Sequence, residues 1–313
     1  MPVILSRERF SIYTWYALCL FLFLAQCPAH AAVSITDDSG NTVTLPAPAA
    51  RIIPLYSGLA ETLAAMGAAD RIIARTDADT TLPGTLPSIG THMRPNQELI
   101  AGLRPDLVVQ FEGREEAGLA AASLARLGIN VARFRVSSFA DLFSCIERLG
   151  VLSGEEEAAA ALAANIRARL DRVREAAAKF RERPKVFFEV RYPNLLGAGA
   201  GSMVNDIIRM AGGDNCLGET PERMVRLSEE ALLLKNPDIY LVQQGPMNKS
   251  PIPVKERAHY RSIAAVQNNF VKVVSEAVFS RPGPQSVVAA EELAFLIQMW
   301  HISRRPDDRA PRR

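Results

Sequence analysis

Apolar runs of strand length alternate with longer segments of helical periodicity through most of the chain. Two of these runs, residues 51–55 (RIIPL) and 185–190 (KVFFEV), are each followed by a helical pattern with a similar end, at 66–70 (MGAAD) and 210–214 (MAGGD). Alternation of strands and helices is typical of parallel sheets covered by helices. The pattern therefore predicts an α/β lobe of parallel strands in each half of the chain.

An internal repeat supports this division. Residues 98–113 (ELIAGLRPDLVVQFEG) and 230–245 (EALLLKNPDIYLVQQG) share Glu, Pro, Asp and Gly at one fixed offset. Each copy predicts a short helix, a Pro-Asp turn and an apolar strand, because proline cannot continue a helical hydrogen-bond ladder. Residues 124–134 and 263–273 again predict a helix followed by a strand, so the two halves share one plan.

A long helix is predicted between the halves, with no glycine or proline from residue 158 to residue 183. Ser153 and Glu156 match a capping box, and residues 158–183 are rich in Ala, Arg, Leu and Glu. About thirty residues would form a rod roughly 45 Å long. The fold class is therefore α/β, with two Rossmann-like three-layer lobes (32–152 and 184–302) joined by a single long helix (153–183). A surface helix inside one domain is the alternative, and residues 303–313 are expected to be a disordered tail.

The N-terminus is typical of an export signal. Arg7 and Arg9 precede an apolar run over 16–25, and Ala-His-Ala ends at Ala31. These features predict a signal peptide over 1–31 and a periplasmic location. An uncleaved anchor helix and a lipoprotein attached through Cys27 are alternatives, although the Gln before Cys27 departs from the usual lipobox.

Composition and charge exclude several classes of protein. Hydrophobic residues make up 48% of the chain and charged residues 22%, which excludes a mostly disordered chain, and the formal charge of +2 gives no support for nucleic-acid binding. Cys145 and Cys216 remain beyond the signal, and we expect them to be buried thiols in different lobes.

Catalytic and metal-binding patterns are absent from the sequence. Beyond the signal it contains His92, His259 and His301, with no HExxH, paired CxxC, GxSxG or Walker sequence. We therefore expect no enzyme activity, no catalytic residue, no metal site and no cofactor. Residues 197–201 (GAGAG) predict a tight turn that places Ser202 as the N-cap of the next helix.

Loops at the carboxyl ends of the predicted strands carry the candidate binding residues. Ligands of open α/β sheets lie beside these strand ends. Arginines and aromatic side chains on facing loops suit a planar or bulky organic ligand with negative charge. The candidates are Tyr56, His92, Met93, Arg94, Phe111, Arg191, Tyr192, Phe279 and Arg281.

The chain resembles the periplasmic iron-siderophore and vitamin B12 binding proteins of ABC importers, whose two lobes are joined by a rigid helix. The resemblance covers about residues 34–300 and is carried by the motifs at 51–55, 61–67, 89–96, 103–109, 211–215 and 281–284. It implies a monomer that holds its ligand between the lobes with little hinge motion and docks on a membrane permease. The same resemblance assigns docking to Glu61 and Glu230, one on each lobe.

The resemblance also bears on the cargo. His92 stands where the B12 binder has a tryptophan, and Met224 replaces a second one, which disfavours cobalamin. Arg94, Arg191 and Arg281 resemble the basic lining that relatives use for ferric siderophores. An iron chelate, in particular an anionic ferric siderophore, is therefore the leading hypothesis for the cargo. The alternatives are cobalamin, haem with His92, Tyr56 or Tyr192 as axial ligand, and molybdate; an exported two-lobe transferase is the rival from another class.

Overall fold

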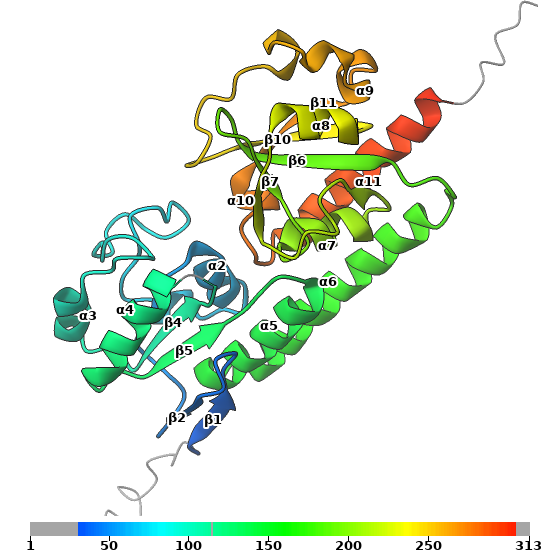
Figure 1. Cartoon of the computed structure of the whole chain (residues 1–313). Coiled ribbons are helices and arrows are strands. Elements are labelled where there is room, and N and C mark those ends of the chain that lie inside the picture. The colour runs from blue at the N-terminus through cyan, green and yellow to red at the C-terminus, as the bar shows by residue number, and fades with distance from the viewer. Residues whose placement is uncertain (1–30, 114, 305–313) are drawn as a thin grey trace, which may run out of the picture.

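The computed structural model describes residues 31–113 and 115–304, so residues 1–30 of the predicted signal and residues 305–313 of the predicted tail lie outside the described part. Figure 1 shows two α/β lobes with a long helix running beside both. Within these described ranges, no strand pairs between the sheets of the two lobes. The predicted α/β class is confirmed.

The N-terminal lobe contains a parallel three-stranded sheet with helices on both faces and a separate β-hairpin at its outer end (Figure 1). Its strands are β1 (Val33–Thr36), β2 (Thr42–Leu45), β3 (Ile52–Pro54), β4 (Leu107–Phe111) and β5 (Val131–Phe134). Its helices are α2 (Ser57–Ala65), η1 (Ala69–Arg71), α3 (Gln97–Leu103), α4 (Glu115–Arg126) and α5 (Phe139–Ser153).

The C-terminal lobe contains a mixed sheet with the order β11-β10-β6-β7-β9, and β8 pairs with β6. Its strands are β6 (Lys185–Arg191), β7 (Leu196–Ala198), β8 (Asp214–Asn215), β9 (Met224–Arg226), β10 (Ile239–Gln244) and β11 (Val271–Ser275). Its helices are α7 (Met203–Met210), α8 (Glu229–Lys235), η2 (Val254–Glu256), η3 (Tyr260–Ser262), α9 (Ala264–Gln267), α10 (Glu276–Phe279) and α11 (Ser286–Ser303).

The prediction of parallel strands was wrong for one edge of this second sheet. Strands β6, β8, β10 and β11 are parallel, whereas β7 is antiparallel to β6 and to β9. The connection from β6 to β7 spans residues 192–195. Such a short link can join antiparallel neighbours but not parallel ones, which need a crossover.

The internal repeat is confirmed, and hydrogen bonds explain its shared aspartate. Asp106 accepts hydrogen bonds at 2.9 Å from the main-chain N–H groups of Ala50 and Arg51, directly before β3, and Asp238 accepts one at 2.9 Å from the N–H of Lys185 at the start of β6. Helices α3 and α8 both end in a left-handed residue, Arg104 and Asn236, directly before the repeated proline. The repeat therefore ties each helix–strand unit to the first strand of the central sheet of its lobe, β3 or β6.

The connecting helix is shorter than expected. Helix α5 ends at Ser153, Gly154 has a φ of 70°, and helix α6 (Glu156–Ala177) then runs for 22 residues, roughly 33 Å. The predicted capping box is wrong, because the Ser153 hydroxyl donates to the Leu149 carbonyl oxygen inside α5. Helix α6 packs against α5 of one lobe and against α7 and α11 of the other.

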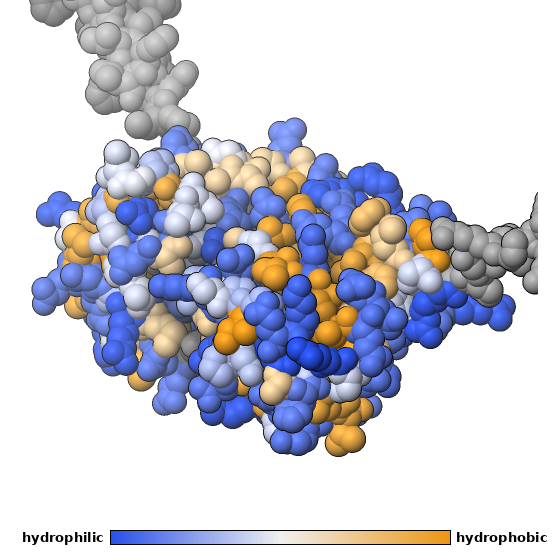
Figure 2. Space-filling view, turned by 90° about the horizontal axis from the view of Figure 1, so that it is seen from above, coloured by the Kyte–Doolittle hydropathy of each residue, from blue (hydrophilic) through white to orange (hydrophobic). Residues whose placement is uncertain are grey.

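Apolar burial is extensive, and the largest cluster of buried residues includes members of both lobes and of α6. The face in Figure 2 is mostly hydrophilic, with apolar residues in scattered groups. Among the described residues, no helix is long and apolar enough to cross a membrane. Cys145 and Cys216 are free thiols in different lobes; Cys145 is buried and Cys216 is partly buried.

Candidate functional site

A cleft of about 200 Å³ lies between the lobes at the ends of their central strands. Residues of both lobes line it, and most of the side chains are aromatic, aliphatic or methionine. Among these apolar lining residues are Leu55, Tyr56, Phe111, Val190, Met203, Met224 and Met247. The cleft therefore offers an apolar surface with polar groups at its base and rim.

Three candidates from the sequence meet on the N-lobe side of this cleft. Tyr56 lies two residues after the end of β3, and Phe111 ends β4, so the parallel sheet brings both to one edge. The Tyr56 ring lies 4.7 Å from the Phe111 ring and 5.5 Å from the His92 ring, measured between centroids. The Gln110 side chain donates a 3.1 Å hydrogen bond to the His92 carbonyl oxygen, which holds the His92 loop against β4.

Burial raises the pKa of Tyr56, although the guanidinium groups of Arg223 and Arg281 oppose the shift. The hydroxyl is therefore protonated at neutral pH. It can donate a hydrogen bond to a ligand acceptor.

An ion-pair cluster closes the base of the cleft. Arg281 lies 3.2 Å from a Glu61 carboxylate oxygen and 3.1 Å from a Glu276 carboxylate oxygen. Glu61 belongs to α2 of the N-terminal lobe, whereas Arg281 and Glu276 belong to the C-terminal lobe, so the cluster joins the lobes. Burial raises the pKa of Glu61, and Arg281 partly offsets this.

This geometry corrects the expectation for Glu61. Its side chain is 13% exposed and is bonded to Arg281, so it does not present an exposed docking carboxylate. Glu230 is exposed, at the second position of α8. Its counterpart in the internal repeat is Glu98, which is exposed at the second position of α3.

Further contacts hold the lobes together below the cleft. A Cβ atom at Gly58 would lie 2.0 Å from the Pro282 carbonyl oxygen, so only glycine fits this approach of α2 to the C-terminal lobe. The Asp206 carboxylate of α7 accepts a 2.8 Å hydrogen bond from the Phe139 N–H at the start of α5. The cleft therefore has a fixed base.

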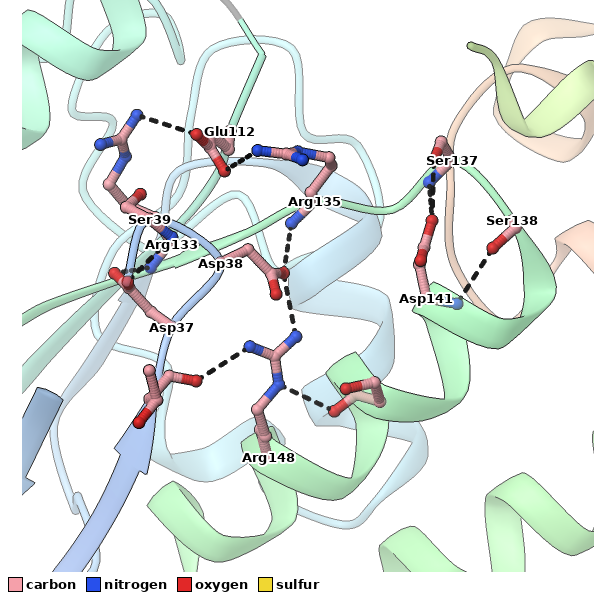
Figure 3. Close-up of polar contacts among 12 residues, drawn as sticks. Asp37, Asp38, Ser39, Glu112, Arg133, Arg135, Ser137, Ser138, Asp141 and Arg148 are labelled. Carbon is pink, nitrogen blue, oxygen red and sulfur yellow. Dashed lines mark hydrogen bonds and ion pairs between the residues drawn. The ribbon is translucent and has the colours of Figure 1, made fainter. Parts of the chain in front are cut away.

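Glu112 forms the polar rim on the N-lobe side. Its carboxylate lies 3.1 Å from Arg135 and 4.0 Å from Arg133 (Figure 3). Asp38 in turn binds the Arg135 N–H and the Arg148 guanidinium, which ties this rim to the β1–β2 hairpin and to α5 (Figure 3).

The structure brings Tyr56, His92, Phe111, Met224 and Arg281 to the cleft. It does not bring the other sequence candidates there. The Arg94 side chain is 83% exposed and lies 3.7 Å from Glu116, and the adjacent Met93 is partly buried outside the lining. Phe279 is buried in the core, where it stacks on Phe188.

Arg191 and Tyr192 line a second hollow beside the cleft. The Tyr192 ring lies 4.0 Å below the Arg257 guanidinium, which binds the buried Glu189 carboxylate.

Several lining residues were missed by sequence reasoning, among them Met203, Arg223, Gln243 and Met247. Met203 follows Ser202, whose side chain accepts a hydrogen bond from the main-chain N–H of Asn205. The prediction that Ser202 is the N-cap of α7 is therefore confirmed. The helix position carried a signal for Met203. Gln243 lies on β10, next to its carboxyl end, whereas Arg223 and Met247 lie on loops whose course the sequence does not predict. Within the described residues, no group of three His, Cys, Asp or Glu side chains could hold a metal ion.

Comparisons with known proteins agree with this architecture. A family model described as periplasmic binding protein matches residues 52–277. An uncharacterized ABC transporter substrate-binding lipoprotein of Bacillus subtilis is 28% identical over 269 residues, which is 84% of each chain. The cobalamin-binding protein of Halobacterium salinarum is 28% identical over 282 residues, 86% of this chain and 74% of that protein.

Solved structures share the fold. The Fe3+-hydroxamate transport protein of Saccharomonospora viridis has a TM-score of 0.71 at 24% identity, over 86% of this chain and 99% of that chain. The periplasmic vitamin B12 binding protein of Vibrio cholerae has a TM-score of 0.70 at 23% identity, over 81% of this chain and 98% of that chain.

Proposed function

We propose, from the premise that this chain belongs to the periplasmic binding protein family, that it captures a bulky metal chelate between its lobes and delivers it to an ABC permease. The observation that carries the proposal is the apolar cleft between the lobes, with Tyr56, Phe111 and Met224 on its walls. Concave sites with a few placed polar groups are the usual form of small-molecule sites.

The charge at the base of the cleft bears on the kind of chelate. Two arginines, Arg223 and Arg281, line the cleft together with two carboxylates, those of Glu112 and Glu276, so its charges balance. Arg281 is paired with Glu61 and Glu276, and Arg94 lies away from the cleft. The centre therefore suits a chelate with an apolar, uncharged face, such as haem or a corrinoid, better than a polyanionic ferric siderophore. A haem cargo would agree with the hypothesis of an iron chelate, whereas the similarity to a cobalamin-binding protein supports a corrinoid cargo.

The contacts at the base support capture with little hinge motion. The Glu61–Arg281 pair, the approach of Gly58 to Pro282 and the Asp206–Phe139 hydrogen bond all join the lobes below the cleft. Helix α6 also spans both lobes, and its Arg169 binds Glu291 of α11 through two hydrogen bonds of 2.8 and 2.6 Å.

Docking on the permease is assigned to Glu98 and Glu230. Both are exposed at the second position of the repeated helix, one on each lobe, and neither helix contributes to the cleft lining. Exposed carboxylates contribute little affinity individually, so their role is to orient the encounter with arginines of a partner.

A ligand panel tests the proposed function. The chain from residue 32 onward would be titrated calorimetrically with haemin, cobalamin, a ferric hydroxamate, a ferric catecholate and molybdate. We expect one chelate per chain, recovered chemically unchanged after the protein is denatured. Binding of molybdate alone, or recovery of a converted ligand, would contradict the proposal and favour an oxyanion receptor or a two-lobe enzyme respectively.

A further inference from the structure

A second hollow of about 480 Å³ lies beside the cleft on the C-terminal lobe. Arg191, Arg226, Asn248 and Lys249 contribute to its lining, and Met247 lines both this hollow and the cleft. The two spaces are therefore neighbours that share one side-chain wall.

The sheet register explains why the two spaces adjoin. Arg191 on β6 pairs with Leu196 on β7, and Leu196 pairs with Arg226 on β9, so the two arginines lie in one row of the sheet. Two strand spacings separate them, roughly 10 Å. Met224, which lines the cleft, lies two residues before Arg226 on the same strand, so both point to the same face.

The charge of the hollow contrasts with that of the cleft base. Of the residues that the structure describes, three cationic side chains and no carboxylate line the hollow. Within the described part of the chain, none of these three cations forms an ion pair, whereas Arg281 has two carboxylate partners.

Buried donors add a second observation. Among residues 31–113 and 115–304, neither the Nε atom of Arg191 nor the Nδ2 atom of Asn248 has a hydrogen-bond acceptor, although both atoms are buried and Asn248 is 5% exposed. Buried donors without an acceptor are costly, so such groups normally indicate a partner that supplies oxygen atoms.

We propose that this basic hollow binds an acidic group, a carboxylate or phosphate, carried by the same ligand whose body occupies the cleft. The proposal rests on the proposed function and names the substrate class more closely: a chelate with an apolar face and an acidic edge. The cleft of about 200 Å³ is smaller than the roughly 300–1,000 Å³ of typical ligand pockets, so a bulky ligand must extend beyond it. The arginine guanidinium matches the planar geometry of a carboxylate.

The first test measures anion binding without assuming a cargo. Citrate would be added at constant ionic strength to the wild-type chain, to Arg226→Ala/Lys249→Ala and to Arg261→Ala/Lys272→Ala, with thermal unfolding as the readout. All four substituted residues are exposed, so both variants are expected to fold. Saturating citrate should raise the Tm of the wild-type and control chains by about 2–4 °C and leave the Arg226/Lys249 variant unchanged. No rise in the wild type, or an equal rise in all three, would overturn the site.

The second test asks whether the acidic group belongs to the cargo. Haemin and its dimethyl ester share one macrocycle and differ in two carboxylates. The Arg226→Ala/Lys249→Ala variant should bind haemin about tenfold more weakly than the wild type does and the ester with less than a twofold change. Equal haemin affinity in both proteins would mean that a free anion occupies the hollow and would overturn the proposal. Citrate stabilisation in the absence of any chelate binding would instead contradict the proposed function and leave an anion site.

Discussion

The approach of Gly58 to Pro282 allows the fixed base of the cleft to be tested by a single methyl group. In Gly58→Ala the new Cβ would lie 2.0 Å from the Pro282 carbonyl oxygen, and ordinary contact begins at 3.4 Å, so α2 and the C-terminal lobe must separate by at least 1.4 Å. The same displacement would lengthen the Glu61–Arg281 distance from 3.2 Å to about 4.6 Å, beyond the range of an ion pair. Overpacking of this kind costs about 1–3 kcal/mol.

Urea unfolding measures that cost, and a matched glycine controls for the added methyl group. Gly102 lies in α3, and a Cβ there would have no neighbour within 4 Å. Gly102→Ala should therefore raise the free energy of unfolding by about 0.5–1 kcal/mol through helix propensity. Gly58→Ala should lower it and weaken chelate binding as well. An unchanged free energy of unfolding in Gly58→Ala would show that the lobes do not touch at this point.

The remaining predictions concern docking and stability. Glu98→Ala/Glu230→Ala should bind chelate normally but lose most uptake in a reconstituted transport assay, and normal uptake would exclude these carboxylates from docking. Arg169→Ala should cost about 0.5 kcal/mol in urea unfolding at pH 7, because the Arg169 hydrogen bonds lower the pKa of the partly exposed Glu291. A carboxyl group whose pKa is lowered in the folded state stabilises the fold at pH values above its usual pKa of 4.5, and this stabilisation is lost as the pH falls through the pKa of the folded state. The difference in unfolding free energy between the wild type and Arg169→Ala should therefore shrink towards pH 3. A difference that does not change with pH would contradict the Arg169–Glu291 pair. Ser138→Ala removes the side chain that caps α5 and should cost about 1 kcal/mol in the same assay, whereas no change would mean that water replaces the cap.

Local patterns predicted the architecture well because the interactions behind them are local. The Pro-Asp turn of the repeat stops α3 and α8, and each aspartate binds the chain where the first strand of its central sheet begins. The same patterns placed Tyr56 and Phe111 at the edge of the first sheet. The start of α6 could not be predicted in this way. Gly154 ends α5, and Glu155, directly before α6, binds Arg71, which lies 84 residues earlier in the chain.

The charges of the site depend on distant partners and were harder to predict. Glu61 resembles an exposed helical glutamate in the sequence, but its partner Arg281 lies 220 residues away. Arg226 and Lys249 carry no local signal, because their meeting with Arg191 depends on the antiparallel edge β7–β9. Phe279 lies next to a loop in the sequence, yet packing of α10 against α11 and β10 buries it.

Blocking the cleft tests the central claim most directly. Ala78 is exposed and lines the cleft, so Ala78→Trp would place an indole in the cleft without disturbing the core; Ala125, exposed on α4, does not line it and gives the matched control Ala125→Trp. Calorimetric titration with the tightest chelate of the panel should give one site per chain in the wild type and in Ala125→Trp, and at least tenfold weaker binding in Ala78→Trp. Equal affinity in all three proteins would place the chelate outside the cleft and contradict the account.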